Sequence, residues 1–115
     1  ILTGDDVERL LPYCKRRVLF HGEGKTFLSY SAAAVLASSR VVLVGTDADS
    51  IAPAFDEVKT HYELARAGIV VLENLNLSAV HDGEYELSCF PIKLGGLEAA
   101  PCRAILFEQE KGLNR

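Results

Sequence analysis

The sequence predicts a mixed α/β fold in which helices pack against a partly parallel β-sheet. Two observations support this prediction. Apolar segments of strand length alternate with segments whose apolar residues recur at helical spacing. One strand segment, 41–45 (VVLVG), is continuously apolar, as is typical of a central strand covered on both faces. The sequence contains no internal repeat, low-complexity tract or linker, so residues 1–115 are expected to form a single domain.

The segments before this central strand predict two helices and one strand. Residues 3–11 carry apolar side chains at helical spacing behind a potential N-cap, Thr3, with Asp6 three residues later. Residues 17–21 (RVLFH) are β-branched and apolar enough for a strand, and the glycine-rich cluster that follows predicts a turn. The alanine-rich segment 29–39 predicts a helix whose small side chains allow close approach to a sheet.

The segments after it predict one more helix and three strands. A loop is expected at 47–55, a helix at 56–67 and a second buried strand at 69–72. Residues 84–93 and 103–107 predict two further strands that pair antiparallel.

Composition, charge and missing motifs exclude several classes of protein. Of the 115 residues, 49% are hydrophobic and 24% are charged, which is typical of globular chains rather than disordered or collagenous ones. No apolar run approaches the ~18–20 residues of a membrane span, and the N-terminus lacks a signal-peptide pattern. The net charge of −4 and the scattered basic residues argue against binding of nucleic acid. Signatures of serine hydrolases, P-loop NTPases, dinucleotide-binding proteins and HExxH proteases are absent.

The cysteine and methionine content leads to two expectations, one about the compartment and one about the length of the protein. Cys14, Cys89 and Cys102 form no CxxC pair, so we expect free thiols in a reducing compartment, the cytoplasm, rather than disulfides or a thiolate zinc site. The sequence has no methionine, even at position 1. We therefore expect the chain to be part of a longer protein.

His61 and Glu73 are the residues most suggestive of chemistry. His61 falls on a helical stripe with Val58, Tyr62 and Ala65, which predicts that its ring faces the core. Glu73 directly follows the next apolar strand. The helix advances roughly 9 Å from His61 to its end and the strand returns roughly 13 Å, so both side chains are expected at one end of the sheet. An imidazole and a carboxylate at a partly buried site are suitable ligands for Zn²⁺ or Mn²⁺.

Each candidate also has a purely structural interpretation. His61 could be a core histidine bonded to a neighbour, and two ligands fall short of the three that catalytic zinc takes from protein. Asp47 lies just beyond the central strand, where α/β proteins place ligand-binding groups, but could equally cap its own turn with help from Ser50. His21 and His81 lie in turns and are expected at the solvated surface.

Three stretches resemble the C-terminal half of the cyclase family of metal-dependent hydrolases, which includes bacterial kynurenine formamidase. They are VGTDADSIAP, THYELARAGIVVLENLNLSAV and GEYELSCFPIKLGGLEAAPCRAILF, and the resemblance extends over essentially the whole chain. It implies a swivelling β/β/α fold, of which this chain would be an incomplete part. It also implies that His61 and Glu73 are ligands of a divalent metal, Zn or Mn. Asp47 and Ser50 match the family's GxDxxS loop and by resemblance support the site.

The sequence departs from the family pattern in ways that affect its expected activity. Ala52 stands where an acidic residue is common, and His21 stands near the usual place of an Arg–Thr pair, which leaves the substrate open. The family's HxGTHxDxPxH segment, which supplies the other metal ligands and the acid/base histidine, is absent. We therefore expect a C-terminal portion that is inactive alone.

The resemblance also implies a reaction and partners for the intact enzyme. Such an enzyme would hydrolyse a small N-formyl or cyclic amide with a metal-activated water. The expected partners are this small-molecule substrate and either a second copy of the chain, in a homo-oligomer, or the missing N-terminal segment. The alternative is a non-catalytic interaction or small-molecule-binding module that keeps the fold.

Overall fold

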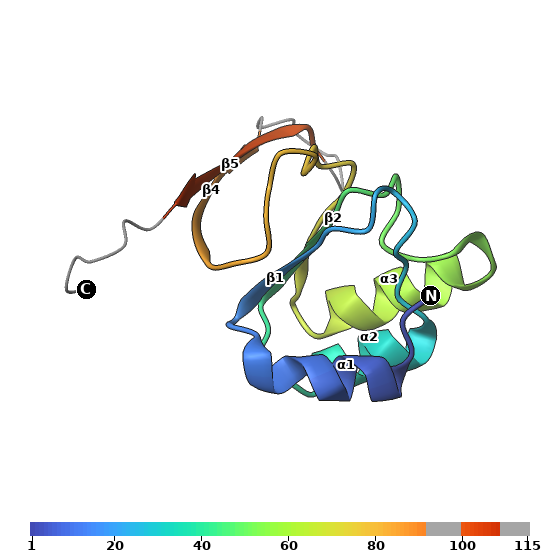
Figure 1. Ribbon diagram of the computed structural model, residues 1–115. Helices are drawn as coiled ribbons and strands as arrows, with labels where there is room; N and C mark the ends of the chain where they lie inside the picture. Colours follow the sequence, from blue (N-terminus) through green and yellow to red (C-terminus); the bar gives the residue numbers. More distant parts are fainter. Residues whose placement is uncertain (92–99, 109–115) are drawn as a thin grey trace. The chain divides into compact units, whose positions relative to one another are not determined.

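The computed structural model describes residues 1–91 and 100–108 of the chain (Figure 1). Contacts among these residues group into two compact units, Ile1–Ala79 and Val80–Arg115, and each is described by itself. The single domain expected over residues 1–115 therefore stays a prediction. Within the described part of the chain, no helix combines the length and the hydropathy needed to span a bilayer.

The first unit contains a three-stranded parallel sheet. Its strands are β1 (Arg17–Phe20), β2 (Leu43–Thr46) and β3 (Val70–Leu72), arranged in the order β1-β2-β3. Both pairs are parallel, with Val44 opposite Val18 on one side and Val71 on the other. The predicted α/β architecture is thus confirmed, and the apolar segment around 41–45 supplies the central strand as expected.

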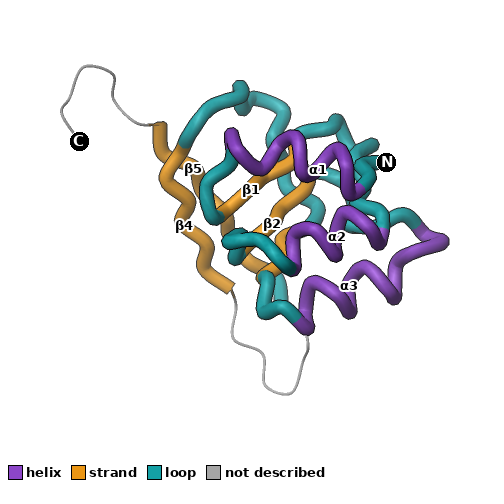
Figure 2. Tube along the Cα trace, turned by 90° about the horizontal axis from the view of Figure 1, so that it is seen from below, coloured by secondary structure: helices purple, strands orange, loops and turns teal. Residues whose placement is uncertain are grey.

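Helices cover one face of this sheet. They are α1 (Gly4–Leu10), α2 (Tyr30–Ala37) and α3 (Glu57–Arg66), with short 3₁₀ turns η1 (Leu11–Tyr13) and η2 (Ala54–Asp56) before or after them. Figure 2 shows α2 between α1 and α3 in a single layer against the strands. Each helix carries the chain back so that the next strand runs parallel to the one before it. The loops that follow the three strands therefore gather at the same end of the sheet.

Local chemistry explains where the first two helices begin. Thr3 Oγ1 accepts the Asp6 N–H at 3.3 Å, and the Asp6 carboxylate accepts the Thr3 N–H at 2.9 Å, which completes the predicted capping box. Ser29 Oγ caps α2 by accepting the Ala32 N–H at 3.2 Å. Ala32 and Ala33 are fully buried, so the small side chains do allow the helix to approach its neighbours closely.

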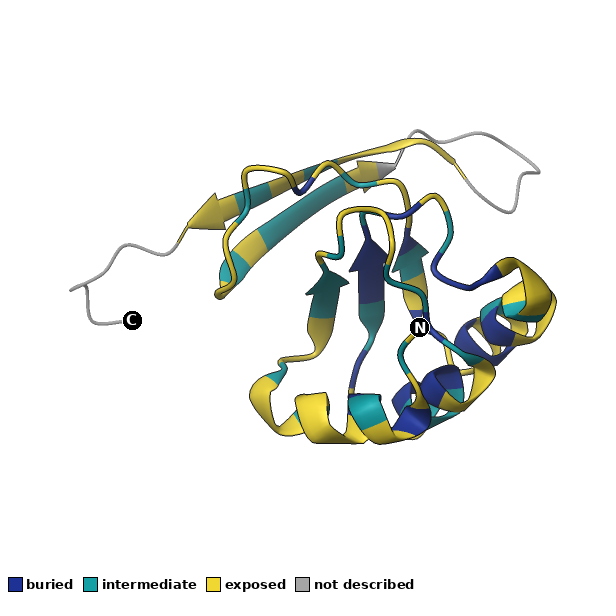
Figure 3. Ribbon diagram, turned by 45° about the vertical axis from the view of Figure 1, so that its right-hand side comes forward, coloured by how far each residue is buried: buried dark blue, intermediate teal, exposed yellow. Residues whose placement is uncertain are grey.

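The core lies between the helices and the sheet, as the buried colours of Figure 3 indicate. It is built mainly from aliphatic side chains, whose full burial contributes about 1.5–3 kcal/mol for each large residue. Its members are Val7, Leu28, Ala32, Ala33, Leu36, Val41, Val44, Ile51, Ala52, Leu64 and Ile69.

The predicted inward face of α3 is wrong. Val58 and Tyr62 of the expected core stripe are 83% and 69% exposed, and the helix buries Thr60, Glu63 and Leu64 instead. These three residues form a second stripe at helical spacing, and the Ile69 N–H bond to the Leu64 carbonyl fixes Leu64 against the start of β3. Glu63 tolerates burial because its carboxylate pairs with Arg66.

The second unit contains a two-stranded antiparallel hairpin. Strand β4 (Tyr85–Pro91) pairs with β5 (Cys102–Glu108), with Leu87 opposite Leu106. The antiparallel pair is therefore confirmed, while residues 92 and 93 of the predicted strand lie outside the described residues. All three cysteines of the chain are free thiols, in agreement with expectation.

Candidate metal centre

The three parallel strands each deliver a polar residue to the same edge of the sheet. His21 directly follows β1, Asp47 directly follows β2 and Glu73 directly follows β3. The carboxyl ends of parallel strands are the usual place of ligand-binding groups in α/β proteins. The first half of α3 adds His61 to this edge.

His61 and Glu73 meet at this edge. His61 Nε2 lies 2.8 Å from Glu73 Oε2. The His61 side chain is 35% exposed and that of Glu73 is 33% exposed, so the ring does not face the core as expected. Both side chains are therefore partly accessible to solvent.

The other ring nitrogen of His61 fixes the tautomer. His61 Nδ1 lies 2.8 Å from the Glu57 carbonyl oxygen, one helical turn earlier. A carbonyl can only accept, so Nδ1 carries a proton and donates it. The lone pair of a neutral ring then sits on Nε2 and points at a carboxylate oxygen. Two such lone pairs 2.8 Å apart require a proton or a cation between them.

The surroundings of His61 favour a positive charge on the ring. Burial acts to lower the pKa of His61, but the Glu57 carbonyl and the Glu73 carboxylate outweigh burial and raise that pKa above its ordinary value. The same electrostatic field that holds a proton at this point favours a metal cation there. The donor set, one imidazole nitrogen and one carboxylate oxygen, fits Zn²⁺ or Mn²⁺.

The backbone holds Glu73 in place. Glu73 Oε2 also accepts the Ile51 N–H at 2.9 Å, which ties the carboxylate to the loop after β2. Asn74, the next residue, adopts a left-handed conformation with φ of 59°, and its N–H donates to the Ala48 carbonyl at 2.7 Å. This conformation is uncommon for residues other than glycine, though asparagine adopts it more readily than most.

The Asp47 carboxylate bonds to the backbone of the loop after β1. Its carboxylate accepts three consecutive backbone N–H groups, of Gly22 at 3.2 Å, Glu23 at 2.9 Å and Gly24 at 3.1 Å. Burial alone would raise the pKa of Asp47, but these three bonds and the nearby His21 lower it overall. Asp47 therefore holds the loop after β1 rather than capping its own turn.

Ser50 and His21 lie around the pair without joining it. Ser50 Oγ accepts the Ala52 N–H at 3.3 Å and so shapes the turn that presents the Ile51 N–H. His21 Nε2 lies 3.9 Å from Asp47 Oδ2. His21 and His81 are exposed residues, as expected.

The described residues form no complete metal site. In the ranges 1–91 and 100–108, no group of three or more histidine, cysteine, aspartate or glutamate side chains is arranged to hold a metal ion. Across the same ranges, no hydrogen bond or ion pair joins Asp47 to His61 or Glu73. The structure therefore brings together His61 and Glu73, two of the four residues singled out from the sequence. The other two, Asp47 and Ser50, lie in the loop after β2.

Sequence reasoning missed the groups that orient His61, Glu73 and Asp47, because these groups belong to the backbone. The Glu57 carbonyl, the Ile51 N–H and the three amides of the β1 loop leave no trace in residue identity. The one available signal was Gly22 and Gly24, since glycine allows the backbone to fold around an anion.

The sequence matches two kynurenine formamidases over most of its length. It is 43% identical over 84 residues to that of Polaromonas naphthalenivorans (strain CJ2), covering 72% of this chain and 38% of that protein. It is 36% identical over 109 residues to that of Bacillus mycoides (strain KBAB4), covering 89% and 50%. The chain thus spans about half the length, or less, of these curated relatives. No family model matches the sequence.

Two solved structures share the fold. One is described as a potential metal-dependent hydrolase with cyclase activity, with a TM-score of 0.80 and 35% identity, covering 95% of this chain and 59% of that one. The other is a predicted metal-dependent hydrolase from Bacillus stearothermophilus, with a TM-score of 0.76 and 34% identity, covering 90% and 55%. By sequence and by fold, the chain belongs to the cyclase family of metal-dependent hydrolases and is similar to kynurenine formamidase.

Proposed function

We propose that the protein hydrolyses a small amide with a metal-activated water, and that this chain contributes His61 and Glu73 as metal ligands. The observation that best supports this role is the 2.8 Å separation of His61 Nε2 and Glu73 Oε2, with Nδ1 bonded to the Glu57 carbonyl. The substrate class is an N-formyl or cyclic amide, and the name of the relatives suggests a formamide of kynurenine. The metal is Zn²⁺ or Mn²⁺.

The chain's own residues prepare the site for this chemistry. A divalent metal bound there would lower the pKa of its water and polarise the substrate carbonyl. The Glu57 carbonyl keeps the ring proton on Nδ1, so Nε2 is the nitrogen available to a metal. The Ile51 N–H fixes one oxygen of Glu73. Both ligands are thus oriented before a metal arrives, which reduces the entropy lost on binding.

The remaining ligands are proposed to come from elsewhere. Catalytic zinc takes about three protein ligands and a water, and this chain offers two. We infer that the other ligands and a proton-transferring histidine belong to a segment outside this chain or to a second copy in a homo-oligomer. The chain alone is then inactive. The three free thiols favour the cytoplasm as its compartment.

Metal titration tests the ligand assignment. Purified wild-type chain is titrated with Zn²⁺ and with Mn²⁺ by isothermal titration calorimetry, beside His61→Ala, Glu73→Gln and a control, His81→Ala. We expect His81→Ala to bind as the wild type does, because His81 is exposed in a separate turn. The two site variants should weaken binding about tenfold or more.

Two outcomes would contradict the proposal. Unchanged metal affinity in His61→Ala and Glu73→Gln would show that these residues are not ligands. Hydrolysis of N-formylkynurenine by the chain alone would contradict the partial site. A wild-type chain that binds neither metal would favour the non-catalytic interaction or small-molecule-binding module instead.

A further inference from the structure

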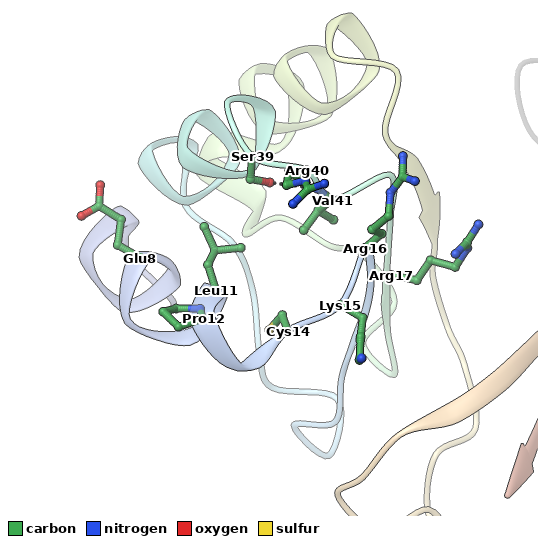
Figure 4. Close-up of a pocket in the computed structure, with 10 residues that line it drawn as sticks. All are labelled: Glu8, Leu11, Pro12, Cys14, Lys15, Arg16, Arg17, Ser39, Arg40 and Val41. Carbon is green, nitrogen blue, oxygen red and sulfur yellow. Dashed lines mark hydrogen bonds between the residues drawn. The ribbon is translucent and has the colours of Figure 1, made fainter. Parts of the chain in front are cut away.

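A second site lies at the amino-terminal ends of the strands, the end opposite His61 and Glu73. It is a pocket of about 790 Å³ within the first unit (Figure 4). Its walls come from the end of α1 with η1, from the residues that lead into β1 and from the connection between α2 and β2. This volume is within the range of pockets that bind small organic ligands.

The lining of the pocket is strongly positive. Arg16, Arg17 and Arg40 line it together with Lys15, and Glu8 is the carboxylate among the lining residues. No carboxylate in the described part of the chain forms an ion pair with any of the three arginines. The guanidinium charges therefore have no protein counter-ion among the described residues.

Two of the arginines, Arg16 and Arg40, lie on neighbouring backbone segments. The Val42 N–H donates to the Arg16 carbonyl at 2.7 Å, which places Arg16 beside the segment that begins with Arg40. Arg16 lies in the bend that leads into β1, and Arg16, Arg17 and Arg40 are all exposed residues. Like charges placed side by side repel each other, and a bound anion would relieve that repulsion.

Capping of α2 does not account for the arginines. Helices α1 and α2 end at this side of the unit, and cations often stabilise helix C-termini. However, the last carbonyls of α2 already have donors: the Ser38 N–H bonds to Val35 at 3.2 Å, and the Ser39 N–H and Oγ bond to Leu36 at 3.0 and 2.6 Å. The arginine donors are therefore not used as caps there.

The floor of the pocket is apolar. Leu11 and Cys14 are half-buried and Val41 is 6% exposed. Burial raises the pKa of the Cys14 thiol, so this side chain is neutral and adds to the apolar surface. Figure 4 shows Leu11 and Cys14 on one side of the pocket and the arginines on the other, with Val41 near Arg40. An apolar floor inside a cationic rim matches a ligand with two chemically different ends.

We propose that this pocket binds a small organic anion, with its carboxylate or phosphate head on Arg16 and Arg40 and its apolar body on Leu11 and Val41. A guanidinium can bind either head through two parallel N–H bonds. The proposal does not depend on the metal centre, because it involves none of the same residues.

The test uses three probes that differ only in the head group: octanoate, octyl phosphate and octanol. Each is titrated into the ¹⁵N-labelled chain at low salt, and binding is followed by calorimetry and by amide chemical shifts. We expect one or both acids to bind about tenfold more tightly than octanol, with the largest shifts at Cys14 and Val41. The preferred acid identifies the head group.

Variants assign the binding to the arginines. Arg16→Gln combined with Arg40→Gln should weaken the acid probe about tenfold or more, while the matched control Arg9→Gln, on the exposed side of α1, should change it less than about twofold. Raising the salt concentration of the wild type should also weaken the acids and leave octanol unchanged.

Three results would overturn this site. They are equal binding of octanol and both acids, equal losses in the double variant and in Arg9→Gln, and shifts centred on His61 and Glu73 instead of Cys14 and Val41. The salt titration uses unaltered protein, so it decides the question even if the double variant folds poorly.

Discussion

Asp47 is the residue whose single carboxylate organises most of the β1 loop. It accepts three amide N–H bonds, and its side chain is only 9% exposed. An asparagine would place an NH₂ group against amide donors, so Asp47→Asn should lower the free energy of unfolding by about 2 kcal/mol. Urea denaturation at pH 7 measures this, with the exposed Asp49→Asn as the control.

The effect of Asp47 should depend on pH in a defined direction. Because its pKa is lowered in the folded state from the ordinary 3.8, its stabilisation is complete above that value. It is lost as the pH falls through the folded-state pKa. The difference between wild type and Asp47→Asn should therefore shrink in acid, and a difference that grows below pH 4 would contradict the role assigned to the carboxylate.

Thr60 carries a buried hydroxyl that has no hydrogen-bond partner among the described residues. The residue is fully buried in α3, beside His61. Valine has the same shape without the unsatisfied group, so Thr60→Val should raise the free energy of unfolding by about 1 kcal/mol.

The matched control for Thr60 is Thr46→Val. Thr46 is equally buried, but its Oγ1 accepts the Ala48 N–H at 3.0 Å, so the same substitution there should destabilise. Both are read by chemical denaturation. Destabilisation by both substitutions would mean that the Thr60 hydroxyl is satisfied.

At the scale of elements, the loop after β1 depends on Gly22. A Cβ at this position would lie 1.7 Å from Thr26 Oγ1 and 2.5 Å from Thr26 Cβ, so Gly22→Ala must displace the loop from Asp47. The expected cost is about 2–3 kcal/mol. Gly68→Ala is the control: its φ is +75°, but no atom lies within 4 Å of the added carbon, so about 1 kcal/mol of backbone strain is expected. A smaller loss for Gly22→Ala than for Gly68→Ala in thermal unfolding would contradict this account.

The elements were predictable where local chemistry decides them. The caps Thr3 and Ser29 determine where two helices start, and the apolar run before Thr46 determines the central strand. The sequence predicts all three of these elements. The buried face of α3 was not predictable, because two stripes at helical spacing compete in its sequence. Packing of Leu64 decides between them, and packing is a property of the assembled unit.

The candidate site, too, is predictable from the sequence in one respect and not in another. The convergence of His61 and Glu73 on one sheet edge follows from helix rise and strand length, which are properties of the sequence pattern. The bonds that orient them come from backbone groups of Glu57 and Ile51, and any residue in the right conformation supplies those. The orientation of His61 and Glu73 therefore could not be predicted from side-chain identity alone.

At the scale of the whole chain, the two units differ in how their strands are supported. In the first unit, β2 lies between two strands beneath three helices, whereas the described hairpin contains two strands only. Two-stranded sheets are marginally stable on their own. Amides of β2 should therefore exchange with deuterium far more slowly than those of β4 and β5, by about a hundredfold or more, which corresponds to at least about 2.7 kcal/mol of local stability.

This exchange measurement also decides how many cooperative units the chain has. If β4 and β5 exchange early while β1, β2 and β3 stay protected, the first unit unfolds independently and carries most of the stability, together with His61 and Glu73. If all five strands exchange at one common rate set by global unfolding, the chain behaves as the single domain predicted from its sequence. In that case the hairpin must draw its stability from contacts beyond its own two strands.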